Sequence, residues 1–124
     1  MTGLHIALID GVPAVRHARQ LMLRAEGFDV RAYASAAPLL ADPLALATAC
    51  IVAEVTMPEI GGVALLKVMR GQGWHGAAIL LAGALSSELA ALAIEQDFTV
   101  MVPTGLADRL LLAGIRTAIA EHSR

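Results

Sequence analysis

A chain of 124 residues, 57% of them hydrophobic, is long enough to bury one core and too short for two, so a single domain over residues 1–124 is expected. The formal charge of −2 disfavours a nucleic-acid-binding surface, and no apolar run reaches the ~18 residues of a membrane-spanning helix. One cysteine and the absence of a signal-peptide pattern at the N-terminus lead us to expect a cytoplasmic protein with no membrane contact.

Short apolar runs alternate along the chain with longer stretches of helical periodicity. The expected strands are residues 5–9, 29–33, 50–54, 77–81 and 99–102. The expected helices are residues 13–26, 36–40, 63–70, 87–97 and 107–121. Segment 42–47 is ambiguous, because Pro43 interrupts a helix that its alanines and leucines favour, and helix plus loop is expected there.

The expected strands are apolar almost throughout, which is typical of a parallel sheet covered by helices on both faces. Five strand–helix units predict an α/β fold, a (βα)5 doubly wound three-layer sandwich. The carboxyl ends of parallel strands share one edge of the sheet, and ligand sites in such folds lie there. The residues expected at this edge are Asp10, Glu54, Ala82 and Thr104.

The stretch Glu54-Val55-Thr56-Met57-Pro58-Glu59-Ile60-Gly61-Gly62 places a carboxylate at the end of a buried strand. Together with Ile6-Ala7-Leu8-Ile9-Asp10, it resembles the receiver domain of response regulators in two-component signalling. The pattern is most similar to receivers of FixJ/LuxR-type transcription regulators. The resemblance implies the CheY-like, flavodoxin-like strand order 2-1-3-4-5, in which Asp10 and Glu54 face each other across a shallow cleft.

The resemblance also implies a phosphorylation site from which this sequence departs. In the family an aspartate accepts the phosphoryl group, two adjacent acids hold a divalent cation, a hydroxyl and a lysine hold the phosphoryl oxygens, and an aromatic residue acts as a switch. The acceptor, second acid, hydroxyl, lysine and switch positions are here Glu54, Gly11, Ala82, Thr104 and Met101. Only Asp10 keeps the family's residue type, so the site is expected to be degenerate.

The expected function is that of an atypical receiver, a pseudo-receiver, that signals without phosphorylation and is not an enzyme. It would serve as a regulatory protein-interaction or dimerisation module, with no cofactor and at most weak residual Mg²⁺ binding by Asp10 and Glu54. Three alternatives stay open. Glu54 could imitate a phosphorylated aspartate, phosphate could be accepted at a non-standard residue such as Thr56, or the two acids could serve a metal-dependent phosphate-handling enzyme of similar fold.

Receivers usually communicate through the fourth helix, fifth strand and fifth helix, which implies a homodimer through that face. A partner protein or a covalently linked output domain outside this chain is also expected, without direct nucleic-acid binding. The expected contact residues are Leu89, Leu92, Leu106, Leu110, Leu111 and Ile115. The alternative is that the last helix is merely well buried. Arg16, Arg19 and Arg24 are expected on a solvated helix face.

Overall fold

The computed structural model describes residues 3–102 and 108–122. Its strands are β1 (His5–Ile9), β2 (Asp29–Tyr33), β3 (Cys50–Glu54), β4 (Ala77–Leu81) and β5 (Thr99–Met101). Its helices are α1 (Pro13–Ala25), α2 (Ala36–Ala41), α3 (Gly62–Gly71), α4 (Ser87–Gln96) and α5 (Asp108–His122), with a single 3₁₀ turn, η1 (Ala45–Ala47), before β3.

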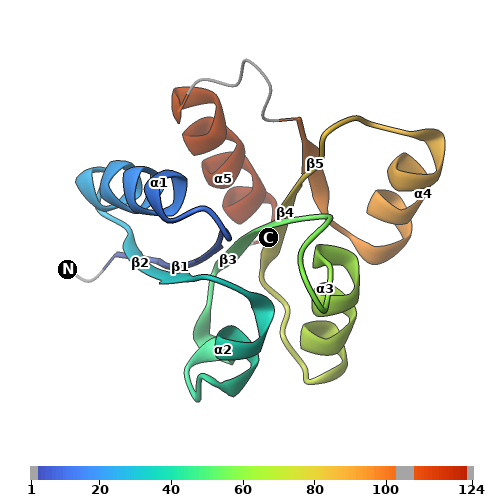
Figure 1. Ribbon diagram of the computed structural model, residues 1–124, viewed down its shortest axis with the longest axis horizontal. Coiled ribbons are helices and arrows are strands. Elements are labelled where there is room, and N and C mark those ends of the chain that lie inside the picture. The colour runs from blue at the N-terminus through green and yellow to red at the C-terminus, as the bar shows by residue number, and fades with distance from the viewer. Residues whose placement is uncertain (1–2, 103–107, 123–124) are drawn as a thin grey trace.

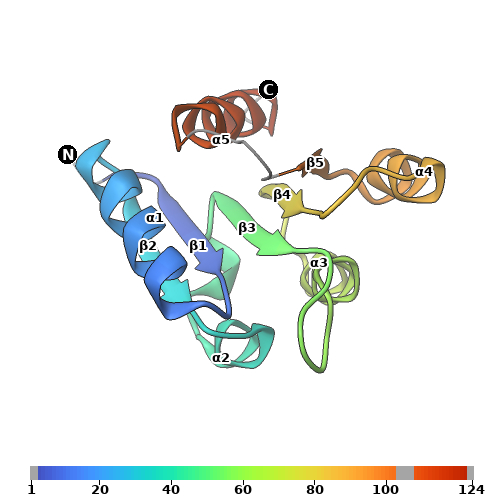
Figure 2. The same cartoon turned by 45° about the horizontal axis from the view of Figure 1, so that its top comes forward.

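The five strands form one sheet in the order β2-β1-β3-β4-β5, and every neighbouring pair is parallel. Helices α1 and α5 cover one face of the sheet, while α2, α3 and α4 lie on the other (Figure 1). Figure 2 shows the same three layers from a second direction. The predicted fold class and strand order are therefore confirmed.

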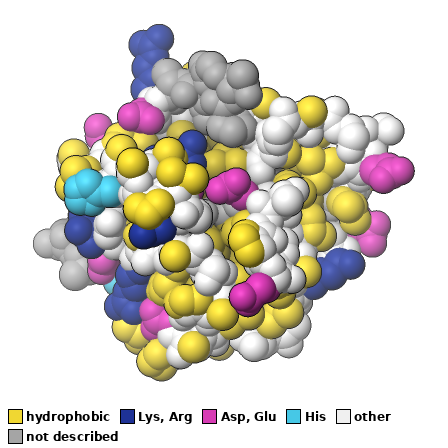
Figure 3. All heavy atoms as spheres, in the orientation of Figure 1, with side chains coloured by type: hydrophobic (Ala, Val, Ile, Leu, Met, Phe, Trp, Pro, Cys, Tyr) yellow, Lys and Arg dark blue, Asp and Glu magenta, His cyan; other side chains and the backbone are white. Residues whose placement is uncertain are grey.

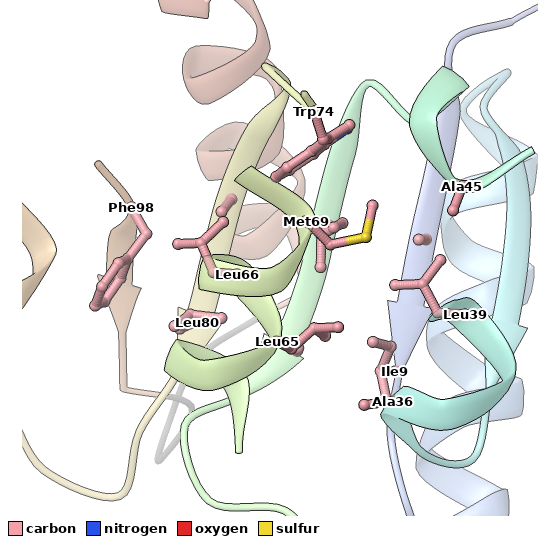
Figure 4. Close-up of a cluster of buried hydrophobic side chains, with 14 of the residues drawn as sticks. Ile9, Ala36, Leu39, Ala45, Leu65, Leu66, Met69, Trp74, Leu80 and Phe98 are labelled. Atoms are coloured by element: carbon pink, nitrogen blue, oxygen red, sulfur yellow. The ribbon is translucent and has the colours of Figure 1, made fainter. Parts of the chain in front are cut away.

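The central strands β1, β3 and β4 are almost entirely apolar because their successive side chains enter different cores, whereas the edge strand β2 also carries Asp29 and Arg31. In β1, Ile6 and Leu8 pack beneath α1 and α5, whereas Ala7 and Ile9 pack against α2 and α3. In the second of these cores, Met69 extends from α3 toward Leu39 of α2 (Figure 4). Both faces of the sheet are thus buried, and the carboxyl edge is left for function.

The single tryptophan closes the end of the α3 core that lies opposite the carboxyl edge. Trp74 is fully buried, and its indole N–H donates to the carbonyl oxygen of Thr48 at 2.7 Å. The Arg70 guanidinium carbon lies 4.6 Å from the centroid of the Trp74 ring, a cation–π contact. The same guanidinium donates to the carbonyl oxygens of Gly76 and Asp97, at 2.7 and 3.1 Å. These contacts join the end of α3 to the start of β4 and the end of α4.

The first four strands have the predicted limits, and β5 ends one residue earlier than expected. Segment 42–47 contains a single 3₁₀ turn, since the Asp42 carboxylate accepts the N–H of Leu44 at 2.8 Å and turns the chain after α2. Ser86 caps α4, accepting the N–H of Leu89 at 3.1 Å, whereas the Ser35 side chain makes no capping bond to α2.

The single cysteine lies inside the sheet. Cys50 is fully buried at the start of β3, and its burial raises the pKa of the thiol to about 12. The thiol therefore stays protonated and unreactive in the folded domain, and Cys50 serves as a small apolar side chain.

The surface carries scattered charges among exposed apolar side chains. Figure 3 shows hydrophobic side chains among polar uncharged groups on the side where Figure 1 places α4. Leu85, just before α4, and Ile94, within it, are the most exposed of the described large hydrophobic residues, at 60% and 85%. No helix in the described ranges is both long enough and apolar enough to span a membrane.

Candidate functional site

The β1–β3 register brings two carboxylates to one edge of the sheet. Ile6 pairs with Cys50 and Leu8 with Val52, so Asp10, which follows β1, and Glu54, which ends β3, lie on adjacent strands at the same edge. Both line a hollow of about 280 Å³ that also contains Ala82 and Arg19. Three of the four residues expected at the edge therefore meet here, and Thr104 lies outside the described residues.

Each carboxylate oxygen of Asp10 already accepts a hydrogen bond within the domain. The residue is 2% exposed, and its Oδ1 accepts the backbone N–H of Val12 at 2.9 Å. Its Oδ2 accepts Nη1 of Arg19, also at 2.9 Å. The first contact is an Asx turn that leads into Pro13, the first residue of α1. The Asp10 side chain is thus part of the connection between β1 and α1.

The expectation of a solvated face for the arginines of α1 is wrong for Arg16 and Arg19. Arg16 donates to the carbonyl oxygen of Asp10 at 2.8 Å, and Arg19 is paired with the carboxylate of the same residue. Residues three apart share a helix face, and helical side chains slant toward the N-terminus, so both guanidinium groups reach back to the end of β1. An acid just before a helix, followed by two arginines spaced three apart, is the sequence signal that could have revealed this contact.

Glu54 is the carboxylate of this hollow to which no side chain in the described part of the chain is bonded. It is partly buried, and no described residue donates a hydrogen bond to its side chain. Burial raises its pKa, the negative charge of Asp10 raises it further, and the positive charge of Arg19 acts in the opposite direction. The pKa of Glu54 therefore depends on the charges of both Asp10 and Arg19, although its side chain forms a hydrogen bond with neither.

Among the other altered positions that the structure describes, Gly11, Ala82 and Met101, no side chain supplies a proton donor or a second acid. Ala82 is buried, and its backbone N–H donates to the carbonyl oxygen of Met101 at 2.9 Å, but its methyl group has nothing to donate to a ligand. Gly11 follows Asp10 without a side chain. Met101 packs inward beneath α5, where its sulfur would lie 2.9 Å from a Cβ built on Gly114.

A second hollow, of about 370 Å³, opens on the α4 side of Glu54. It shares Glu54 and Ala82 with the first hollow, so the two hollows are adjacent. Its further lining includes Thr56, Ser86 and Glu88. Thr56 is exposed in the loop after β3.

The residues at this edge do not fit a divalent cation. Magnesium requires carboxylate or carbonyl oxygens free to enter an octahedral shell, and both oxygens of Asp10 already accept hydrogen bonds. In the described ranges no three His, Cys, Asp or Glu side chains lie where they could share a metal ion. The site holds an arginine beside its buried acid instead.

The expected contact residues of α4 and α5 are only partly available. Leu89, Leu111 and Ile115 are buried in the core, at 8%, 1% and 0% exposure, so their assignment to a contact surface is wrong. The helices are apolar on several sides, and periodicity alone could not tell the buried leucines from the exposed ones. Leu110 is exposed, Leu92 packs partly against the core, and Leu106 lies outside the described residues.

No protein-family model matches the chain. The transcriptional regulatory protein FixJ of Azorhizobium caulinodans is 31% identical over 121 residues, which are 98% of this chain and 57% of that protein. FixJ of Bradyrhizobium diazoefficiens is 29% identical over 117 residues, 94% of this chain and 57% of that protein. This chain is a response-regulator receiver domain related to FixJ. It spans a little over half the length of these two relatives.

Solved structures show the same fold as this receiver. A CheY-like receiver domain protein from Methanospirillum hungatei JF-1 superposes with a TM-score of 0.80 at 20% identity, covering 98% of this receiver and 97% of that chain. The response regulator DrrB of Thermotoga maritima gives a TM-score of 0.83 at 18% identity, covering 96% of this receiver and 54% of that chain.

Proposed function

We propose that this receiver is a regulatory domain of two-component signalling that works without accepting a phosphoryl group. The observation that carries the proposal is the state of Asp10, whose two carboxylate oxygens are bound by Val12 N–H and by Arg19. Phosphoryl transfer to a carboxylate depends on a cation that offsets the charge of the transferred group. A buried acid already paired with arginine offers that cation no ligand.

The surroundings of Glu54 support the same proposal. A glutamate that imitated a phosphorylated aspartate would need donors to receive its extended charge, and Ala82 offers no side-chain donor. The raised pKa of Glu54 also shows that its surroundings disfavour the charged form on which such an imitation depends. We therefore propose that the site has lost phosphoryl transfer, and that Glu54 does not hold the domain permanently in an active state. The same deficit of metal ligands and donors argues against an enzyme.

Without a phosphoryl input, we propose that the domain regulates by association. Ile94 of α4 and Leu110 of α5 are apolar and exposed, and Val102 follows β5 at 36% exposure. Exposed apolar side chains on neighbouring elements favour a protein contact, and two copies meeting through the same face would close as a dimer. Because the FixJ relatives are named transcriptional regulatory proteins and are longer than this receiver, we propose a linked output domain as the element it controls.

The direct test is an amide NMR spectrum of the labelled receiver during addition of Mg²⁺ and then beryllofluoride, a phosphoryl mimic. Resonances of Asp10, Glu54 and Ala82 are expected to stay unchanged. Saturable shifts at these residues would contradict the proposal. A dilution series on the same sample is expected to shift resonances along α4 and α5, and their constancy would contradict association through this face.

A second candidate is a receiver that accepts phosphate on Thr56. The observation in its favour is that Thr56 is exposed and lines the 370 Å³ hollow beside Glu54. Incubation with acetyl phosphate or a kinase-containing extract, followed by peptide mass spectrometry, separates the two candidates. Phosphate on Thr56 would favour this candidate, and an unmodified Thr56 favours the first.

A further inference from the structure

The charged groups of the 280 Å³ hollow are two carboxylates and one guanidinium. Asp10 and Arg19 form the ion pair, and Glu54 responds to the charges of both. A divalent cation between two acids would leave no net charge, whereas Arg19 leaves one negative charge when Glu54 is ionised. The site therefore holds two carboxylates with a guanidinium beside them.

The Arg19–Asp10 pair is withdrawn from water on both sides. The Arg19 side chain is 18% exposed and that of Asp10 is 3% exposed, with 2.9 Å between Nη1 and Oδ2. Surface ion pairs contribute little because solvent screens them, but removing one partner of a buried pair leaves a charge that must find another counterion. Asp10 without Arg19 would be such a charge, at the edge of a hollow that a small cation can enter.

We propose that Arg19 is the resident cation of this site and masks a latent divalent-metal site formed by Asp10 and Glu54. The guanidinium occupies the Asp10 oxygen that a metal would need and supplies the positive charge permanently. This inference rests on the proposed function in one respect, since both hold that the wild-type site is closed to metal.

Arg16 provides a matched control because it also binds Asp10, but at the backbone and not at the carboxylate. It donates to the backbone carbonyl oxygen of Asp10, not to the carboxylate. Its removal takes away a cation of the same helix face and leaves both carboxylate oxygens bound as before. If any loss of positive charge were enough to open a metal site, the variants lacking Arg16 and Arg19 would both gain metal binding. If Arg19 itself masks the site, only the variant lacking Arg19 gains it.

The experiment is a Mn²⁺ titration of the full 124-residue chain, followed by paramagnetic broadening of amide resonances and by calorimetry. Arg19→Met is expected to bind Mn²⁺ at least about tenfold more tightly than the wild type, with broadening centred on Asp10 and Glu54. Arg16→Met is expected to behave like the wild type. The double variant R19M/D10N is expected to lose the gain, because the freed carboxylate is then absent.

Two results would overturn the inference. One is a folded Arg19→Met variant that gains no Mn²⁺ binding, and the other is a wild type that binds Mn²⁺ at Asp10 as tightly as the variant does. If Arg19→Met does not fold, Arg19→Gln, which keeps a donor but no charge, takes its place. If neither folds, Arg19 is a structural residue and the inference fails.

The two proposals fail in different measurements. If neither the wild type nor folded Arg19→Met binds Mn²⁺, the proposed role of Arg19 is contradicted. The phosphate-independent function is not affected by that result. A phosphate adduct on the wild type after acetyl phosphate contradicts that function, whatever Arg19→Met does with Mn²⁺.

Discussion

Gly62 approaches the end of β3 so closely that a Cβ on it would lie 2.5 Å from the carbonyl oxygen of Glu54. Its N–H donates to the carbonyl oxygen of Val55 at 3.0 Å, which fixes the first turn of α3 against the strand that carries the site. A glycine at the start of α3 is thus required by its close packing against Glu54, the residue that replaces the acceptor.

We expect Gly62→Ala to lower the free energy of unfolding by about 1–3 kcal/mol, because the added methyl group meets backbone that cannot move aside cheaply. Gly71→Ala at the other end of α3 is the control, since a Cβ there meets nothing within 4 Å. That substitution should stabilise the domain by about 0.5–1 kcal/mol through helix propensity. Urea unfolding measures both, and equal effects from the two alanines would contradict the packing account.

The raised pKa of Glu54 predicts how stability depends on pH. The folded state binds this proton more tightly than the unfolded chain, so the unfavourable contribution of Glu54 is absent below its ordinary pKa of 4.5. The contribution grows as pH rises through the raised folded value and is constant above it. Glu54→Gln should therefore become more stable relative to the wild type across this window, as measured by urea unfolding at a series of pH values.

The Glu54 pKa also provides an internal check on its causes. Asp10→Asn removes the negative charge that contributes to the shift, so the pKa of Glu54, followed by carboxyl NMR, is expected to fall toward its ordinary value. An unchanged pKa in this variant would mean that burial alone accounts for the shift.

Restoring the acceptor alone is expected to leave the receiver unphosphorylated. Glu54→Asp returns an aspartate to the end of β3, but Arg19 still holds Asp10 and Ala82 still lacks a hydroxyl. No phosphate adduct should appear in the intact mass after incubation with acetyl phosphate and Mg²⁺, and the same holds for E54D/A82T. An adduct on Glu54→Asp alone would show that the cation site is open in the wild type.

Ile94→Lys is expected to abolish self-association without loss of fold. The side chain is 85% exposed on α4, so a charge there should change the free energy of unfolding by no more than about 0.5 kcal/mol. Sedimentation velocity over a range of concentrations should show only monomer. Leu46→Lys is the control, because Leu46 is exposed in η1, away from α4 and α5, and should leave association unchanged.

Much of the fold could be predicted because its signals are local. Asp10 ends the apolar run of β1, Glu54 ends that of β3 and Gly76 precedes that of β4. Pro13 marks the first turn of α1. Segment 42–47 was less clear, since its turn depends on a side-chain bond from Asp42 to Leu44 that composition does not reveal.

The sequence predicted where the site lies but did not predict its main contact, the ion pair between Arg19 and Asp10. Asp10 and Glu54 could be placed together because parallel strands share an edge. The Arg19 ion pair spans nine residues and depends on how α1 packs on the sheet, so charge content alone favoured a solvated face. Likewise, burial of Leu111 and Ile115 depends on which side of an apolar helix meets β4, which the sequence pattern leaves undecided.

Because Cys50 is buried in the sheet, chemical modification of its thiol reports unfolding of the domain. The thiol lies on a central strand, is inaccessible in the folded state and is protonated because burial raises its pKa to about 12. A thiol reagent can therefore modify this chain only when β3 separates from its neighbours. The rate of modification reports how often the middle of the sheet comes apart, and an oxidant that spares the folded receiver marks each molecule that has unfolded.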